Sequence, residues 1–181
     1  ARGTSGGELA MDDWVLERYK IRANGQPSGA SAREVFIQAL ITAEPDRLLY
    51  GFSDVNLPIG HEQELREFAR VFTALPRERF LPVLDTGLLS NLAIRILRQA
   101  ESTYFYIANP TPLRLNAVLE INSDKPALPL TGGEALKIVD GSSSHKIIAV
   151  ELEPFGLAAG KSGSPNLEII SYKIANPSEA E

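Results

Sequence analysis

The sequence predicts an α+β fold, in which a short helical or βα segment is followed by an antiparallel β-sandwich. Two observations support this fold class. Before residue 86, the apolar residues have a helical period over much of the chain. After residue 86, the chain consists of short strand-like segments separated by turns. We therefore place an α/β segment, the end of a barrel, at residues 8–78 and a sandwich domain at residues 80–175.

A helix is predicted directly after Ser31, because Ser31 and Glu34 have the spacing of a capping box. An apolar stripe follows, and Pro45 ends the helix. The stripe consists of Val35, Phe36, Ala39, Leu40 and Ala43. The earlier segment 15–22 has both helical and strand spacing, so the sequence leaves these two structures open.

A short apolar strand is predicted at residues 47–52, followed by a polar loop and a second helix at 61–75. The inward residues of this helix are expected to be Leu65, Phe68, Ala69, Phe72 and Leu75. The order helix, strand, loop, helix is typical of a βα unit, in which ligands bind at the carboxyl ends of strands. One such unit cannot close a barrel, so it either packs on the second domain or has partners upstream.

The second half contains seven predicted strands separated by turn signals such as Asp140-Gly141 and Gly163-Ser164-Pro165. The strands are expected at residues 92–98, 103–109, 113–121, 134–139, 146–152, 157–160 and 167–174. The segment 113–121 alternates apolar and mostly polar residues, which indicates a half-buried strand. Seven short strands over about 90 residues predict an antiparallel sandwich.

Several motifs of this second half resemble the β-sandwich that follows the catalytic barrel in many bacterial glycoside hydrolases. They are Ala93 to Ile96, Tyr104 to Thr111 with its Asn109-Pro110 pair, Leu130 to Gly133, and Val150 to Leu157 with its Pro154-Phe155-Gly156-Leu157 ending. The segment 60–76 resembles the last barrel helix before that sandwich, so the resemblance covers residues 45–175.

The resemblance implies a carbohydrate-active parent enzyme whose catalytic barrel lies upstream and is the partner of the sandwich. It does not imply that this segment is catalytic, because glycoside hydrolases need two carboxylates placed across the glycosidic bond. The chain is then expected to be an excised or processed C-terminal segment. One expectation is that the protein is secreted or periplasmic in a bacterium, although the sequence leaves the compartment open.

Asp54 and Glu62 are the candidate catalytic carboxylates. Asp54 follows the end of the predicted βα strand, and Glu62 lies in the first turn of the next helix. We favour a structural interpretation of both. Asp54 suits a turn, and Glu62 suits the first turn of a helix, where negative charge interacts favourably with exposed amides. A third possibility is that Asp54 or Asn56 contributes to a composite active site with another chain.

Candidate substrate-binding residues are Asn56, Trp14, Tyr104 and Tyr106. Aromatic rings can stack on sugars, since they offer flat apolar area with a polar edge. For Trp14 a core position at a helix start is the favoured interpretation. Tyr104 and Tyr106 share one face of their strand, and we favour burial of both faces of that strand over a sugar platform.

Composition excludes several classes of partner. The net charge of −5, with scattered basic residues, argues against nucleic acid. No apolar run approaches the roughly 20 residues that span a bilayer, so no membrane partner is expected. His61 and His145 have no companion at ligand spacing and the chain has no cysteine, so neither a metal nor a cofactor is predicted.

An oligosaccharide is a further candidate partner. The main alternative function is a non-catalytic interaction or carbohydrate-binding sandwich module, whose helices cover one face of the sandwich.

Overall fold

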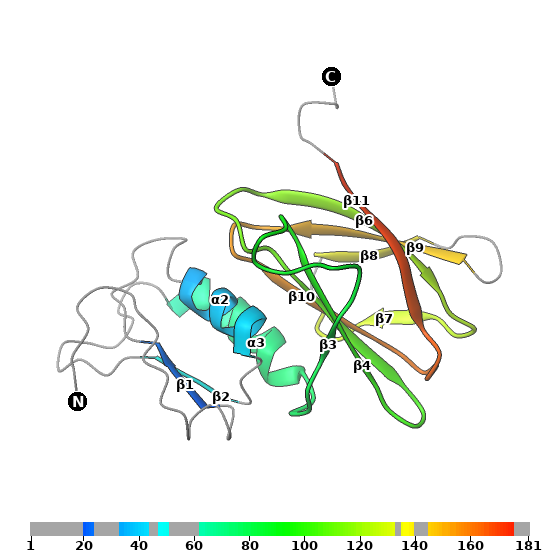
Figure 1. Ribbon diagram of the computed structural model, residues 1–181, viewed down its shortest axis with the longest axis horizontal. Helices are drawn as coiled ribbons and strands as arrows, with labels where there is room; N and C mark the ends of the chain where they lie inside the picture. Colours follow the sequence, from blue (N-terminus) through cyan, green and yellow to red (C-terminus); the bar gives the residue numbers. More distant parts are fainter. Residues whose placement is uncertain are drawn as a thin grey trace.

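The computed structural model describes residues 20–23, 33–43, 47–50, 62–132, 135–139 and 145–175 (Figure 1). The first part holds strand β1 (Lys20–Ala23), helix α2 (Glu34–Ala43), strand β2 (Arg47–Tyr50) and helix α3 (Glu62–Ala74). The second part holds β3 (Leu81–Pro82), β4 (Ala93–Arg98), β5 (Thr103–Ala108), β6 (Leu115–Asn122), β7 (Ala127–Pro129), β8 (Leu136–Val139), β9 (His145–Leu152), β10 (Leu157–Ser162) and β11 (Glu168–Ala175).

The second part is a β-sandwich of two antiparallel sheets, so the predicted α+β fold is confirmed. One sheet has the strand order β3-β4-β5-β10-β7 and the other the order β11-β6-β9-β8. Side chains of both sheets meet in one apolar core between them. The largest fully buried members of this core are Leu92, Ile94, Ile96, Phe105, Ile107, Leu119, Ile121, Ile148, Leu152 and Leu167.

Strand β6 shows how the sequence pattern produces this arrangement. Leu115, Ala117, Leu119 and Ile121 are buried, while the residues between them are exposed or half-buried. A strand alternates its side chains between two faces, so this pattern places one face of β6 in the core and the other in solvent. The predicted alternation is thus confirmed for residues 115–121, whereas Leu113 precedes the strand and is 66% exposed.

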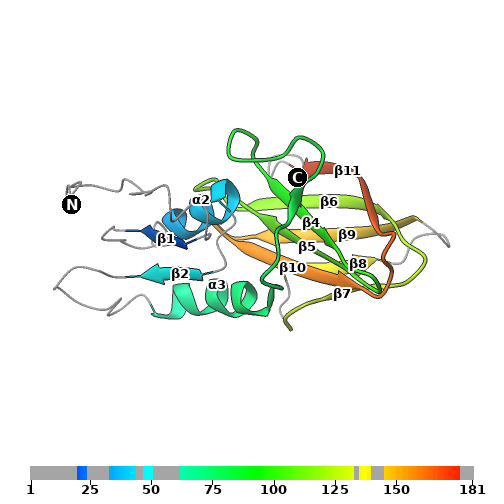
Figure 2. The ribbon, with the colours of Figure 1, turned by 60° about the horizontal axis from the view of Figure 1, so that its bottom comes forward.

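Strand β5 has a different environment, because it lies in the middle of the five-stranded sheet. Phe105 and Ile107 belong to the core between the sheets, while Tyr106 and Ala108 belong to a second core on the opposite face. Helices α2 and α3 supply the other side of this second core, and Figure 2 shows both helices beside the five-stranded sheet. The sheet is therefore covered by the second sheet on one face and by helices on the other.

The first part has the βα pattern that the sequence predicts. Strands β1 and β2 pair in parallel, with Ile21 opposite Leu48, and α2 connects them. Of the segment 15–22, whose structure the sequence left open, residues 20–22 form a strand, and residues 15–19 lie outside the described ranges. A complete barrel and the boundaries 8–78 and 80–175 stay predictions.

The helices differ from the prediction in which residues they bury. In α2 the buried residues are Phe36, Ile37, Ala39, Leu40 and Ile41, so Val35 and Ala43 lie at the edge of the stripe. In α3, Val71 is buried and Ala69 is exposed, opposite to expectation. Phe68, Val71, Phe72 and Leu75 form the i, i+3, i+4, i+7 stripe, and Ala69 falls outside it.

Candidate functional site

Most of the predicted first-half site residues lie outside the described ranges. Trp14, Asp54 and Asn56 belong to this group, and Glu62 is described only through its backbone, as the first residue of α3. The pairing of Asp54 with Glu62 therefore stays a prediction, as do the roles of Trp14 and Asn56.

The two candidate tyrosines occupy different environments. Tyr106 is 1% exposed, its ring centroid lies 5.2 Å from that of Phe80, and its hydroxyl lies 3.5 Å from the main-chain oxygen of Leu40. Tyr104 is half-buried, and Lys161 Nζ lies 4.9 Å from its ring centroid. Tyr106 thus packs as a core residue under the helices, whereas one face of Tyr104 is in contact with a cation.

Two of the motifs that carry the hydrolase resemblance, 104–111 and 150–157, meet at one corner of the sandwich. Asn109 is fully buried, and its Nδ2 donates to the main-chain oxygens of Leu113 at 2.6 Å and Glu153 at 2.9 Å. Its Oδ1 accepts hydrogen bonds from the amide and hydroxyl of Thr111. The main-chain amide of Asn109 also donates to Gly156. The Asn-Pro and Pro-Phe-Gly motifs therefore have a structural role.

A tight turn at residues 153–156 completes this corner. The Gly156 amide donates to the oxygen of Glu153 at 2.8 Å, and a Cβ at Gly156 would lie 2.8 Å from that same oxygen. Phe155 has a φ of 53°, a left-handed conformation that is unusual for a large side chain, and it is buried in the second core. Glycine is thus sterically required at position 156.

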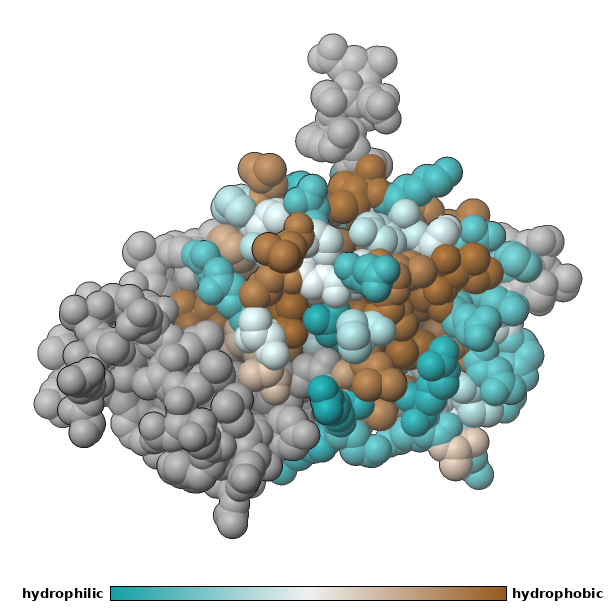
Figure 3. All heavy atoms as spheres, viewed as in Figure 1, coloured by the Kyte–Doolittle hydropathy of each residue, from teal (hydrophilic) through white to brown (hydrophobic). Residues whose placement is uncertain are grey.

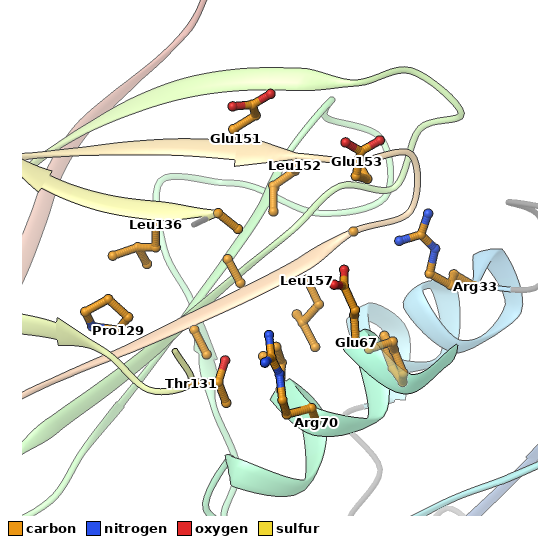
Figure 4. A pocket seen from close by; sticks show the side chains of 16 residues that line it. Arg33, Glu67, Arg70, Pro129, Thr131, Leu136, Glu151, Leu152, Glu153 and Leu157 are labelled. Carbon is orange, nitrogen blue, oxygen red and sulfur yellow. The ribbon is translucent and has the colours of Figure 1, made fainter. Parts of the chain in front are cut away.

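Beside this corner lies a cleft of about 380 Å³ between α3 and the edges of the two sheets (Figure 4). Its apolar lining comes from Phe68, Val71, Pro129, Ala135, Leu136, Leu152, Leu157, Ala158 and Ala159. Its charged lining comes from Arg33, Glu67, Arg70, Glu151 and Glu153. The cleft thus combines an apolar floor with charged groups of both signs.

Three of the charged groups reach the cleft from the helical part of the chain. Arg33 precedes the first residue of α2, Glu67 and Arg70 lie on α3, and Figure 4 shows their heads directed toward the cleft. Nε of Arg33 is buried, and no acceptor of the described ranges lies within hydrogen-bond distance of it. Within those ranges no ion pair joins Arg33 or Arg70 to another residue.

Arg114 holds the two glutamates on the other side of the cleft. Its Nη1 lies 3.5 Å from Oε1 of Glu151, and its Nη2 donates to Oε1 of Glu153. The side chains of all three residues are about half exposed, so we expect each ion pair to stabilise the fold only slightly. Their main effect is on the orientation of the carboxylates.

A second polar cluster lies on the outer face of the four-stranded sheet. Glu120 Oε1 lies 3.1 Å from His145 Nδ1, and Glu120 Oε2 accepts from the Ser171 hydroxyl at 3.2 Å. The hydrogen bond with His145 and, next, that from Ser171 lower the pKa of Glu120 below its ordinary value. Ser171 contacts the glutamate rather than the histidine, so these residues are not arranged as a nucleophile with its base.

No group of acidic, histidine or cysteine residues that could hold a metal ion occurs in the described part of the chain. Neither α2 nor α3 is long and apolar enough to cross a membrane.

Comparison with known proteins gives no family. No known protein family and no curated protein sequence matches the chain. Among solved structures, a hypothetical protein from Leishmania major matches with 11% identity and a TM-score of 0.36 over 55% of this chain and 82% of that one.

Two glycoside hydrolases are also weak structural neighbours. A chitinase from Bacillus thuringiensis is 17% identical with a TM-score of 0.31, covering 46% of this chain and 15% of the chitinase. A β-N-acetylglucosaminidase from Vibrio harveyi is 14% identical with a TM-score of 0.27, covering 48% of this chain and 17% of the enzyme.

The cleft residues were not identified from the sequence. Arg33, Glu67 and Arg70 resemble ordinary solvent-facing helix residues, and Glu151 appears as the outer residue of an alternating strand. One local signal was available in the 150–157 motif, where Glu153 directly precedes Pro154 in a turn. The rest of the cleft depends on how helix and sandwich pack together.

Proposed function

We propose that this chain is the C-terminal segment of a carbohydrate-active, glycoside hydrolase-like enzyme, in which the β-sandwich supports the catalytic barrel. The role of the segment itself is structural. The proposal rests on the resemblance of the second-half motifs and on the packing of the sandwich against the α/β elements.

The second core is the observation that carries this proposal. Phe36, Ile37, Leu40 and Ile41 of α2 and Phe68 and Val71 of α3 pack with residues of β4, β5 and β10. The centroids of Phe36 and Phe68 lie 5.6 Å apart, so the helices also contact each other in this core. Burial of this apolar area stabilises the contact between the α/β elements and the sandwich.

Arg95 adds a polar link between the same two parts. It is buried in β4, and its guanidinium donates to the main-chain oxygens of Thr86 at 2.9 Å and of Ile41 in α2 at 3.2 Å. A helix leaves its last carbonyl groups without intrahelical partners, so Arg95 satisfies an acceptor near the end of α2. The sandwich therefore fixes the end of this helix.

The loop between β3 and β4 supports a contact with a larger α/β unit. Leu84, Leu88 and Leu89 are exposed on it, and Leu89 has no burial at all. The loop is held by the Thr86 hydroxyl, which donates to Val83 at 2.8 Å, and by the hydrogen bond from Arg95. Figure 3 shows that apolar side chains are frequent on this face of the molecule. Apolar groups held outward in this way are typical of interaction surfaces.

The test uses the longer protein that contains this segment, with Phe80→Ala and Leu81→Ala as a matched pair. Phe80 is 4% exposed in the second core, whereas its neighbour Leu81 is 55% exposed. We expect Phe80→Ala to lower the temperature of half-inactivation of glycosidase activity while kcat/KM at ambient temperature stays within about twofold. Leu81→Ala should change neither quantity.

Two results would contradict the proposed function. One is that the longer protein hydrolyses no member of a broad panel of aryl glycosides and oligosaccharides. The other is that Phe80→Ala leaves the inactivation temperature unchanged, which would mean that the sandwich does not stabilise the catalytic part.

The cleft is the observation that favours the second candidate function, a carbohydrate-binding sandwich module. The two functions are compatible, because a supporting domain can also carry a binding site.

A further inference from the structure

The cleft beside α3 has the composition of a binding site for a small ligand. We infer that it binds one or two units of a neutral saccharide, in contact with Arg33, Arg70, Glu67 and Glu153. The choice of a sugar among neutral polar ligands rests on the proposed function, whereas the charge and shape of the ligand follow from the cleft itself.

The size and floor of the cleft suit an amphipathic ring. Its volume of about 380 Å³ is near the lower end of the range for small-molecule sites. The buried residues Leu136, Leu152 and Leu157 lie in its floor, and packing holds their side chains in place. A sugar ring has an apolar face of C–H groups, which can pack on such a floor while its hydroxyls face the rim.

Hydrogen-bond donors are available on the helix side. Arg33 and Arg70 carry guanidinium groups with five N–H donors each, and within the described ranges neither is held by an ion pair. The buried Nε of Arg33 lacks an acceptor there. A buried donor without a partner is unfavourable, so an incoming hydroxyl oxygen would satisfy a group that the fold leaves unsatisfied.

Hydrogen-bond acceptors are available on both sides. Glu67 presents its carboxylate from α3, and Arg114 orients the carboxylates of Glu151 and Glu153 from the opposite wall. A carboxylate held at one oxygen by an arginine keeps its other oxygen for a ligand. Donors and acceptors therefore surround the same apolar floor.

The balance of charges selects a neutral ligand. Two arginines and three glutamates line the cleft, and a third arginine, Arg114, neutralises part of the glutamate charge. With Arg114 included, the arginine and glutamate charges around the cleft balance, so it carries no net charge that would favour an anion or a cation. Each hydroxyl group can donate to a carboxylate and accept from a guanidinium, so a polyhydroxylated ligand matches both sets.

Amide chemical shifts of the whole chain, measured by NMR, provide the test. The probes are glucose, xylose, N-acetylglucosamine, cellobiose and xylobiose, with inorganic phosphate and acetate as anionic probes and glycerol as a non-cyclic polyol. At least one saccharide should give saturable shifts in Leu136 and in residues 157–159. Because the cleft is open and small, we expect a Kd of about 1 to 10 mM.

Variants distinguish the cleft from other surfaces. Arg70→Met and Glu67→Gln change exposed residues of α3, so both should fold, and each should weaken binding about tenfold, as expected for a lost charge-assisted hydrogen bond. Glu120→Gln, on the outer face of the four-stranded sheet, is the matched control and should leave the Kd within about twofold.

The inference would be overturned by the absence of a saturable shift with any saccharide up to about 50 mM, several times the expected Kd of about 1 to 10 mM. Saturable shifts confined to another surface, or binding of phosphate or acetate in place of sugars, would also overturn it. None of them bears on the glycosidase activity of the longer protein, which tests the proposed function separately. Equal binding of glycerol and cyclic sugars would also contradict the role of the apolar floor.

Discussion

Asn109 and Glu153 lie 44 residues apart in the chain and are joined by a hydrogen bond of 2.9 Å from the Asn109 side-chain amide to the Glu153 main-chain oxygen. The same amide nitrogen donates to Leu113 at 2.6 Å. One buried side chain thus connects the end of β5, the start of β6 and the turn before β10. This turn carries Glu153 of the cleft and Phe155 of the second core.

Asn109→Ala should destabilise the fold, because the buried Asn109 side chain donates to two main-chain carbonyl groups that would lose this donor. We expect a loss of about 2 to 4 kcal/mol in the free energy of unfolding, measured by denaturant titration. Asn116→Ala, at an exposed position of β6, is the control and should stay within about 0.5 kcal/mol. Equal stabilities of the two variants would mean that the corner does not depend on Asn109.

Arg95→Met should weaken the link between the sandwich and α2. Methionine keeps an apolar stem but cannot donate to Thr86 and Ile41, so we expect a loss of about 2 kcal/mol in unfolding free energy and faster amide exchange in α2. Arg98→Met in the same strand is the control, since Arg98 is exposed and makes one long hydrogen bond of 3.4 Å to Leu167. A slower or unchanged exchange of α2 in Arg95→Met would contradict this role.

Gly160→Ala should disturb the sandwich core. A Cβ at Gly160 would lie less than 3.0 Å from three ring atoms of Phe105, which is fully buried and cannot move away easily. Overpacking of this kind typically destabilises by about 1 to 3 kcal/mol. Gly132→Ala serves as the comparison, because a Cβ there meets no atom within 4 Å. The melting temperatures of the two variants should differ clearly, and a similar value for both would argue against the pairing of β10 with β5.

Glu120 should make stability depend on pH in the acid range. The hydrogen bonds with His145 and Ser171 hold the pKa of Glu120 below its ordinary value of 4.5. A carboxyl whose pKa is lowered by folding stabilises the fold above its unfolded pKa, and this stabilisation is lost as the pH falls through the folded pKa. Glu120→Gln should therefore reduce the loss of stability between about pH 5 and pH 3.

The measurement is the midpoint of urea unfolding at several pH values. Glu101→Gln, an exposed residue in the turn before β5, is the control and should keep the pH profile of the unsubstituted protein. A Glu120→Gln profile that is parallel to the unsubstituted one over this range would show that Glu120 is not held by its neighbours.

The strands of the sandwich could be predicted because the order of apolar and polar residues within each strand indicates which of its faces are buried. Strand β6 alternates strictly, and β5 is apolar on both faces, as a central strand between two cores must be. The short strands β3 and β7 were not predicted as strands. They exist only through pairing with distant partners, such as Leu81 with Ile96 and Ala127 with Ser162, and two or three residues have no period of their own.

The helices show why burial is harder to predict than secondary structure. Both helices were predicted, although α2 begins at Glu34 rather than directly after Ser31. In α3, Ala69 is exposed and Val71 buried, because the face that a helix buries depends on the partner surface. The same reason applies to the cleft. Arg33, Arg70 and Glu153 come from three segments, and only tertiary packing brings them to one site.

Hydrogen exchange of the whole chain, followed by mass spectrometry, most directly tests whether the sandwich supports the α/β elements. If the second core joins them, α2 and α3 should open with about the same free energy as β5, as one cooperative unit. If α2 and α3 instead exchange completely while β5 stays protected, the helices do not depend on the sandwich, and the supporting role is contradicted.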